Sequence, residues 1–165
     1  MNSEKFRVLI VCTGNTCRSP MAEGILKSIL GSEDGEIEVS SAGIASLDGS
    51  LASAYAVEAA RNWGVDISDH RARQLDTRMV KSADLVLAMA PEHVEYILRK
   101  VPEAEKKTYL IKSFPGGNSS SRERIEDPIG GSFDRYNQTF LELDEILRRI
   151  KPEILRLARS SRAGY

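Results

Sequence analysis

Four short apolar runs recur along the chain and are separated by longer amphipathic stretches. Each run is rich in β-branched residues and leucine and is bounded by polar or turn-forming residues, which predicts buried strands. The runs cover Arg7–Cys12, Ile37–Ser40, Asp84–Met89 and Thr108–Ile111. They are apolar almost throughout instead of alternating, so helices should cover both faces of the expected sheet.

The amphipathic stretches predict helices, because their apolar residues recur at helical spacing. Ser19-Pro20 has the form of an N-cap followed by proline at the first helical position, and this helix should end near Leu30. Further helices are expected over residues 54–61 before Gly64, from Asp76 or Thr77 through Val80, from Pro91 to Val101, and from Phe133 to Ile150.

The connections between these elements are rich in glycine, serine and proline. Gly31–Gly35 is expected to be a polar turn, and Phe114–Gly131 a long loop. Pro152 should kink or restart the last helix. The end of the chain, Ser160–Tyr165, should fray.

The alternation of strands and helices predicts an α/β fold. We expect a Rossmann-like, four-stranded parallel sheet with helices on both faces. The 165 residues fit a single domain, residues 1–165, with its core over residues 7–150. Ligands of such sheets bind beyond the carboxyl ends of the strands. The turn between the first strand and the first helix is therefore where a ligand site is expected.

Composition narrows the class of protein. A net charge of −1 gives no bulk attraction to nucleic acid or to an anionic membrane. The apolar runs are too short for membrane insertion or a signal peptide, so we expect a cytoplasmic protein with reduced cysteines. The two cysteines and two histidines, His70 and His93, match no zinc spacing, and no metal or cofactor is expected.

Both cysteines lie in the first strand-to-helix turn, "CTGNTCRS". Gly14 and Asn15 tolerate left-handed backbone angles, so successive N–H groups can point into one cup beside a helix N-terminus. Arg18 adds a planar fork for two phosphate oxygens. At the bottom of this cup the pKa of Cys12 should fall to roughly 4–7, with Ser19 close enough to donate to its sulfur.

A thiolate beneath a phosphoryl group is a nucleophile aimed at phosphorus, so a phosphocysteine intermediate is expected. The leaving group then needs a proton, and Asp127-Pro128 in the long loop is the candidate donor. Ionised Asp127 would next activate a water to release inorganic phosphate. A cysteine after a strand is more often a core residue, and Asp-Pro more often begins a turn, but the full pattern favours chemistry.

The pattern "VCTGNTCRSP" with a distant "DP" resembles the low-molecular-weight protein tyrosine phosphatase family. Four other stretches of the chain are similar to family motifs. They are "SSAG" at Ser40–Gly43, "DISDHRARQL" at Asp66–Leu75, "SADLVLAM" at Ser82–Met89 and "DPIGGSFDRY" at Asp127–Tyr136. The resemblance implies the low-molecular-weight phosphatase fold, no metal, and phosphorylated proteins as substrates.

The resemblance also implies a role for individual residues. The nucleophile falls on Cys12, the phosphate-binding arginine on Arg18 and the general acid on Asp127. The phosphate loop comprises Thr13, Gly14, Asn15, Thr16 and Cys17, and its bracing network falls on Asn15, Ser19, Ser41 and His70. By the same resemblance, Cys17 is expected to trap oxidised Cys12 as a reversible disulfide.

Two departures from the family pattern bear on the substrate. Tyrosine-directed members carry aromatic residues where this chain has Leu47, Ile129 and Gly130. Thr16 resembles the threonine of bacterial protein arginine phosphatases, and a β-branched polar residue narrows the site. Both features favour phosphoarginine over phosphotyrosine, which stays the alternative. If the Thr16 hydroxyl is bonded locally, the residue has no such role.

Two remoter functions use the same loop. Arsenate reductases relay electrons through cysteines outside the loop, and this chain has none after Cys17. A non-catalytic phosphate-binding or redox-sensing module needs neither a thiolate nor an acid. The joint presence of Cys12, Arg18 and Asp127 argues against such a module.

Overall fold

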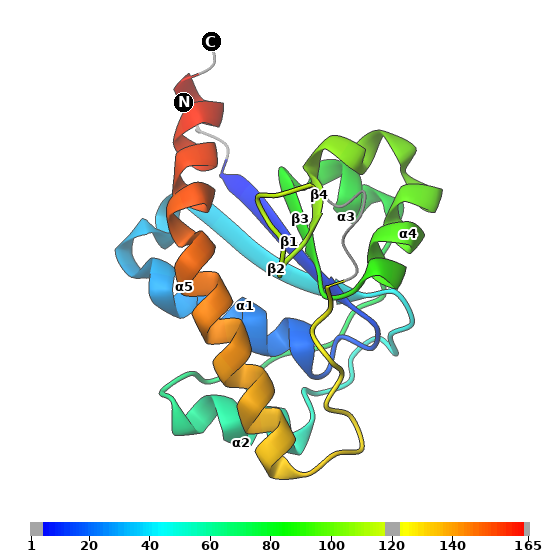
Figure 1. Cartoon of the computed structure of the whole chain (residues 1–165), viewed down its shortest axis with the longest axis vertical. Helices are drawn as coiled ribbons and strands as arrows, with labels where there is room; N and C mark the ends of the chain where they lie inside the picture. The colour runs from blue at the N-terminus through cyan, green and yellow to red at the C-terminus, as the bar shows by residue number, and fades with distance from the viewer. Residues whose placement is uncertain (1–4, 118–122, 164–165) are drawn as a thin grey trace.

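The structure of the chain, a computed structural model, describes residues 5–117 and 123–163. Its centre is a sheet of four parallel strands in the order β2-β1-β3-β4 (Figure 1). The strands are β1 (Phe6–Cys12), β2 (Ile37–Gly43), β3 (Leu85–Ala88) and β4 (Thr108–Leu110). The prediction of a four-stranded parallel sheet is confirmed.

Helices cover both faces of the sheet (Figure 1). The helices of one face are α1 (Arg18–Leu30), α2 (Ala54–Asn62) and α5 (Phe133–Ala163). Those of the other are α3 (Thr77–Ser82) and α4 (Pro91–Lys100). Two short 3-10 helices, η1 (Gly31–Glu36) and η2 (Pro102–Lys107), connect elements.

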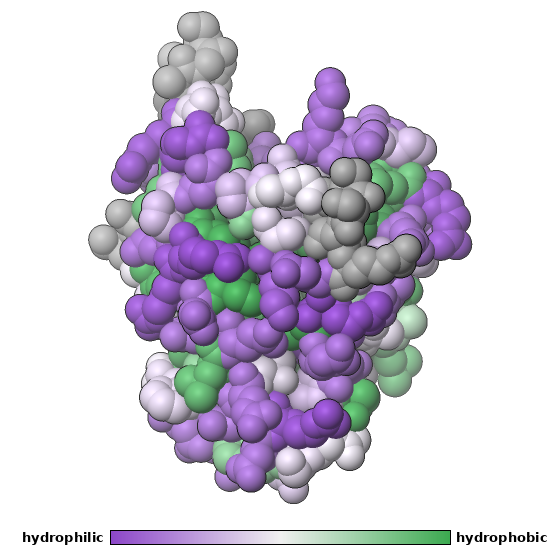
Figure 2. All heavy atoms as spheres, viewed as in Figure 1, coloured by the Kyte–Doolittle hydropathy of each residue, from purple (hydrophilic) through white to green (hydrophobic). Residues whose placement is uncertain are grey.

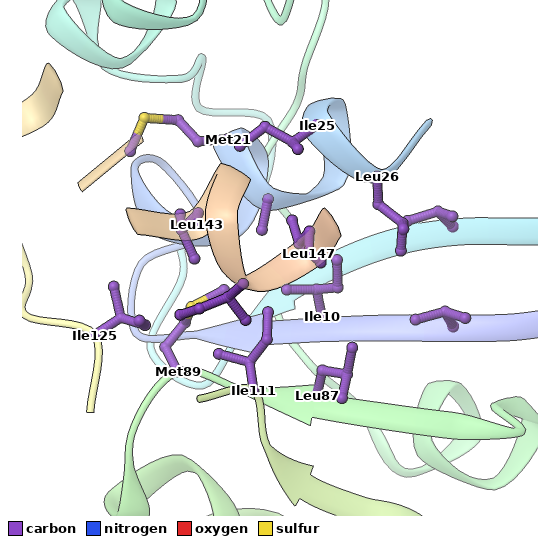
Figure 3. Packing of buried hydrophobic residues seen from close by; sticks show 14 of the residues in the cluster. Ile10, Met21, Ile25, Leu26, Leu87, Met89, Ile111, Ile125, Leu143 and Leu147 are labelled. Atoms are coloured by element: carbon purple, nitrogen blue, oxygen red, sulfur yellow. The ribbon is translucent and has the colours of Figure 1, made fainter. Parts of the chain in front are cut away.

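The alternation of side chains along β1 divides the core into two layers. Ile10 packs with the residues of α1 and α5, including Met21 and Leu143, and Figure 3 shows these side chains converging between helices and sheet. Leu9 points to the opposite face, where it packs with Ile97 of α4. Because both faces are covered, the central strands β1 and β3 are apolar at nearly every position, as the sequence pattern indicated, whereas the outer strand β2 also carries Glu38, Ser40 and Ser41.

The register aligns the carboxyl ends of three strands at one edge. Cys12 at the end of β1 pairs with Gly43 at the end of β2, and Val11 pairs with Ala88 at the end of β3. The loop that follows Cys12 therefore leaves the sheet where β2 and β3 also end. This edge is where the sequence placed the ligand site.

The start of α1 differs from its prediction. The helix begins at Arg18 and its N-cap is Cys17, which makes no side-chain capping bond, so Ser19 is not the cap. The reason is that the Ser19 hydroxyl lies against Cys12 and Asn15 instead. A serine before a proline satisfied the local capping pattern, but the neighbouring loop uses its oxygen.

Other boundaries shift as well. β2 continues past Ser40 to Gly43, and the expected turn at residues 31–35 is the helix η1. Helix α5 runs through Pro152 without restarting, and it continues to Ala163, so fraying from Ser160 is wrong for this part of the chain. Residues 118–122 of the predicted long loop and residues 164–165 of the tail lie outside the described residues.

The face drawn in Figure 2 is mostly hydrophilic over α5, as expected for a helix with one apolar stripe. Within residues 5–117 and 123–163, no helix combines the length and apolar character needed to span a membrane.

Candidate active site

The loop after β1 curls around the sulfur of Cys12. Asn15 has a left-handed backbone with φ of 58°, which turns its N–H toward the Cys12 Sγ at 3.3 Å. The Ser19 Oγ lies 2.9 Å from the same sulfur. Ser19 Oγ also accepts from the Asn15 side-chain amide, so its own proton is available to the sulfur. Two donors therefore converge on Cys12.

The acidity of Cys12 is governed mainly by its burial. The residue is 2% exposed, and burial raises the pKa of its thiol because a thiolate there loses its hydration. The hydrogen bonds of Ser19 and Asn15 and the charge of Arg18 lower this pKa, but they offset the rise only in part. The expected fall of the pKa to roughly 4–7 is therefore wrong in direction. That expectation counted the donors and omitted the burial.

Asn15 is the hub of the loop, and its side chain is fully buried. Its amide nitrogen donates to Ser19 Oγ at 2.8 Å and to Ser41 Oγ at 2.9 Å. Its amide oxygen accepts from the backbone N–H of Arg73 at 3.0 Å. The His70 Nε2 lies 2.8 Å from the Asn15 carbonyl oxygen. The structure thus places Ser19, Ser41 and His70 around one asparagine.

Two further residues of this network were missed from the sequence. Glu23 accepts the hydroxyl proton of Ser41, and the Arg73 Nε donates to the Ser41 carbonyl at 2.9 Å. Nothing in the spacing of Arg73 along the sequence indicated that it would reach the end of β2. Glu23 had no signal beyond its place one turn into the first helix.

The segment that follows β2 holds the loop after β1 in place through backbone hydrogen bonds. The N–H groups of Ile44 and Ala45 donate to the carbonyls of Cys12 and Thr13 at 3.0 and 2.9 Å. The Ser53 N–H donates to the Thr16 carbonyl at 2.9 Å. These three bonds fix the backbone of the loop at both of its ends.

Arg18 is 4% exposed, and its guanidinium lies at the centre of the polar site. Its Nη1 donates to the Ile125 carbonyl at 2.9 Å, and its Nη2 donates to Thr13 Oγ1 at 3.2 Å. Nη2 also lies 3.5 Å from Asp127 Oδ2. Arg18 therefore joins the loop after β1 to the segment that carries Asp127.

The segment around Asp127 is tied to the sheet edge. Ile125 is fully buried and its N–H donates to the Met89 carbonyl at 2.8 Å, just beyond β3. Arg124 pairs with Glu92 of α4 at 3.0 Å. Asp127 itself is partly exposed, and its Oδ1 accepts from the Ile129 N–H at 3.1 Å. The Asp127 carboxylate thus reaches the site from a loop segment that is firmly attached to the rest of the fold.

The second cysteine faces away from the network of Asn15. Cys17 Sγ lies 3.4 Å from Ser53 Oγ and donates to the Tyr136 hydroxyl at 3.6 Å. Burial, together with Cys17, raises the pKa of Tyr136 to about 12, so its hydroxyl stays protonated. Cys12 and Cys17 are both free thiols.

Large apolar side chains stand exposed on segments next to the loop. Leu47 is 77% exposed in the turn after β2, and Ile129 is 66% exposed two residues beyond Asp127. Tyr55, at the start of α2, is 45% exposed and packs edge-on against Phe133 and Tyr136. The positions singled out for substrate choice are therefore accessible.

The arrangement suits attack on a bound anion. It offers a sulfur beneath converging donors, a buried guanidinium, and a carboxylate on the exposed side. In the described parts of the chain, no three His, Cys, Asp or Glu side chains come together as metal ligands would. A phosphoryl group is the anion that matches a thiol, an arginine fork and an acid together.

Comparison with known proteins agrees with this chemistry. A family model described as low molecular weight phosphotyrosine protein phosphatase matches residues 7–160. The protein-arginine-phosphatase of Bacillus subtilis (strain 168) is 37% identical over 147 residues, covering 89% of this chain and 95% of that protein. The low molecular weight protein-tyrosine-phosphatase Etp of Escherichia coli (strain K12) is 35% identical over 133 residues, covering 81% and 84%.

The fold is shared with a solved relative. A structure of the YwlE arginine phosphatase, a mutant with a phosphorylated active-site serine, matches with a TM-score of 0.83 and 36% identity, covering 92% of this chain and 99% of that one. The chain belongs to the low molecular weight phosphotyrosine protein phosphatase family and is a phosphatase of that type.

Proposed function

We propose that this phosphatase removes phosphate from phosphoarginine in proteins, through a phosphocysteine on Cys12. Arg18 and the loop N–H groups hold the phosphate, and Asp127 is the acid and then the base. The residues of these roles lie together at one edge of the sheet, joined through Arg18. The relative with a phosphorylated active-site serine supports an intermediate on the loop nucleophile.

The reaction proceeds in two displacements. The Cys12 thiolate attacks phosphorus, a sulfur–phosphorus bond forms, and the nitrogen–phosphorus bond to the guanidine breaks. Asp127 gives its proton to the departing nitrogen. In the second step Asp127 takes a proton from water, whose oxygen attacks phosphorus. Inorganic phosphate leaves, and the sulfur departs as thiolate, so Cys12 and Asp127 return to their starting states.

The phosphoarginine preference rests on the state of Thr16. The residue is half-buried in the loop, and its backbone is fixed by Ser53. Among the described residues, its hydroxyl has one side-chain contact, to the Cys17 sulfur at 3.8 Å, which is long and weak. The hydroxyl is therefore not taken up by a strong local bond. Such a bond would have left Thr16 without a role in substrate choice. A free hydroxyl beside the phosphate suits a polar guanidinium.

Phosphotyrosine remains the second candidate, and Tyr55 is the observation that favours it. This exposed ring lies against Phe133 and Tyr136, so the site is not without aromatic residues. A substrate phenyl ring could stack there. Against it, the position after Asp127-Pro128 is the aliphatic Ile129.

The test is a pair of substitutions at Thr16. Thr16→Ile should lower kcat/KM for a phosphoarginine peptide at least tenfold more than for a phosphotyrosine peptide. The reason is that one lost polar contact costs roughly 1–3 kcal/mol. Thr16→Val keeps the branched shape and loses only the hydroxyl, so it should show the same selective loss on the phosphoarginine peptide if the hydroxyl, and not the added bulk of isoleucine, is responsible. Equal losses on both peptides in Thr16→Ile would show that Thr16 does not select the substrate.

The remaining alternatives make a different prediction for Cys12. A binding or redox-sensing module would keep its function in Cys12→Ser, or would depend only on a Cys12–Cys17 disulfide. The phosphatase proposed here loses turnover in Cys12→Ser. We also propose a cytoplasmic location and a protective role for Cys17. The first proposal rests on the lack of a long apolar run in the sequence, and the second on the position of Cys17 five residues after Cys12 in the same loop.

A further inference from the structure

Histidine 93 lies at the active site, although the sequence gave it no role. It is the third residue of α4, it is fully buried, and its Nε2 lies 2.9 Å from Thr13 Oγ1. The same Thr13 oxygen accepts from Arg18 Nη2 at 3.2 Å. A continuous series of hydrogen bonds therefore leads from α4 to the proposed phosphate site, through His93, Thr13 and Arg18.

The proton in each bond of this series can be assigned. Arg18 carries only donors, so Thr13 Oγ1 must accept from it. If the Thr13 hydroxyl then donates to His93 Nε2, both of these groups are satisfied. The buried His93 Nδ1 lacks a partner among the described residues in either tautomer. The arrangement with Nε2 as acceptor thus leaves the fewest groups unsatisfied.

The surroundings keep the imidazole neutral, as an acceptor must be. Burial lowers the pKa of His93 to about 4, and the nearby charge of Arg18 acts in the same direction. Glu92 and Asp127 oppose this effect, and Arg124 adds to it. At neutral pH the ring therefore carries a single proton. A protonated ring would instead present an N–H to Thr13 and repel the arginine.

We propose that His93 is a positioning residue that orients the Arg18 guanidinium through the Thr13 hydroxyl. The Ile125 carbonyl holds Nη1 of Arg18, and the series from His93 holds Nη2. Because both nitrogens are held, the Arg18 guanidinium is already oriented before phosphate binds. This role rests on the proposed function of Arg18 as phosphate ligand, and it does not depend on which phosphorylated side chain is the substrate.

The experiment measures phosphate binding directly, as the inhibition constant of inorganic phosphate against p-nitrophenyl phosphate. His93→Leu fills the buried space with an apolar side chain and removes the acceptor. It should raise this constant roughly tenfold, within the range for losing one buried hydrogen bond to a charged network. His93→Gln can place its amide oxygen near the position of Nε2, and it should restore binding to within about threefold of the wild type.

A matched control separates positioning from general damage. Thr108→Val removes another buried hydrogen bond, to the Ala104 carbonyl at 2.8 Å, far along the chain from the loop. It should leave the inhibition constant unchanged. An unchanged constant in His93→Leu would overturn the proposal, and so would a His93→Gln variant as weak as His93→Leu.

If His93→Leu does not fold, a spectroscopic measurement on the wild-type protein can still test whether His93 Nε2 is a hydrogen-bond acceptor. Nitrogen-15 NMR of the wild-type imidazole at neutral pH should show an unprotonated Nε2 and a protonated Nδ1. A protonated Nε2 would overturn the proposal. A wild-type enzyme that binds phosphate but prefers phosphotyrosine would defeat the substrate assignment alone.

Discussion

A Cβ atom on Gly43 would lie 2.5 Å from the carbonyl oxygen of Thr13. Gly43 ends β2 and Thr13 begins the phosphate loop, so the sheet edge and the loop meet where only glycine fits. The same Cβ would lie 2.9 Å from the Asn15 nitrogen, the group that donates to Cys12. The close approach makes the geometry of the site depend on the strand beneath it.

Gly43→Ala should therefore displace the loop backbone. We expect kcat/KM to fall by roughly 10- to 100-fold, because small shifts of catalytic groups have effects of that size. Overpacking should also lower the free energy of unfolding by about 1–3 kcal/mol. Gly35→Ala is the control, since a Cβ there meets nothing within 4 Å. Steady-state kinetics and urea unfolding check both effects, and full activity in Gly43→Ala would contradict the account.

Asn15 offers a test of the loop's bracing that is free of backbone strain. Asn15→Gly keeps access to the φ of 58° while losing the side-chain bonds to Ser19, Ser41 and Arg73. Its kcat/KM should fall by roughly 10- to 100-fold. Asn15→Ala should be less stable than Asn15→Gly by about 1–2 kcal/mol, because alanine resists left-handed angles. Wild-type kcat/KM in Asn15→Gly would show that the bracing does not matter.

The pH dependence of Cys12 should report the Ser19 hydrogen bond. That bond stabilises the thiolate, so Ser19→Ala raises the pKa of Cys12 further, in the same direction as burial. The pH midpoint of iodoacetamide alkylation, measured in a Cys17→Ser background, should move upward by about 1–2 units, the equivalent of one charge-assisted hydrogen bond. Ser28→Ala, on the exposed side of α1, should not shift it. A midpoint that stays or moves downward in Ser19→Ala would refute this assignment.

The sequence predicted elements whose cause is local. The run Val8–Val11 sufficed for β1, because a strand covered on both faces is apolar at every position. Cys12, Arg18 and Asp127 could be proposed because their chemistry is readable from residue type and spacing. The structure then placed Asp127 beside Arg18, although 109 positions separate them.

The features that could not be predicted from the sequence depend on contacts between residues far apart along the chain. Thr13 meets His93 over 80 positions, and no periodicity marks such a pair. Ser19 matched a capping pattern, yet its oxygen is used by Cys12 and Asn15. The pKa of Cys12 was misjudged for a similar reason, since burial is set by the whole fold.

Asp127→Asn should expose the role of the acid through the leaving group. A guanidine leaves poorly without a proton, whereas p-nitrophenolate is a stable anion. The substitution should lower kcat/KM by roughly 10²- to 10⁴-fold for a phosphoarginine peptide and much less for p-nitrophenyl phosphate. Glu126→Gln, its exposed neighbour, is the control and should change neither substrate. Equal losses on both substrates would assign Asp127 to binding instead of proton transfer.

The ratio of two specificity constants of the wild-type enzyme tests the proposed preference for phosphoarginine most directly. One is kcat/KM for a phosphoarginine peptide, and the other is kcat/KM for a phosphotyrosine peptide of the same flanking sequence. The phosphoarginine value should be the larger by at least tenfold, and Cys12→Ser should abolish turnover of both peptides. A larger value for phosphotyrosine would contradict this preference.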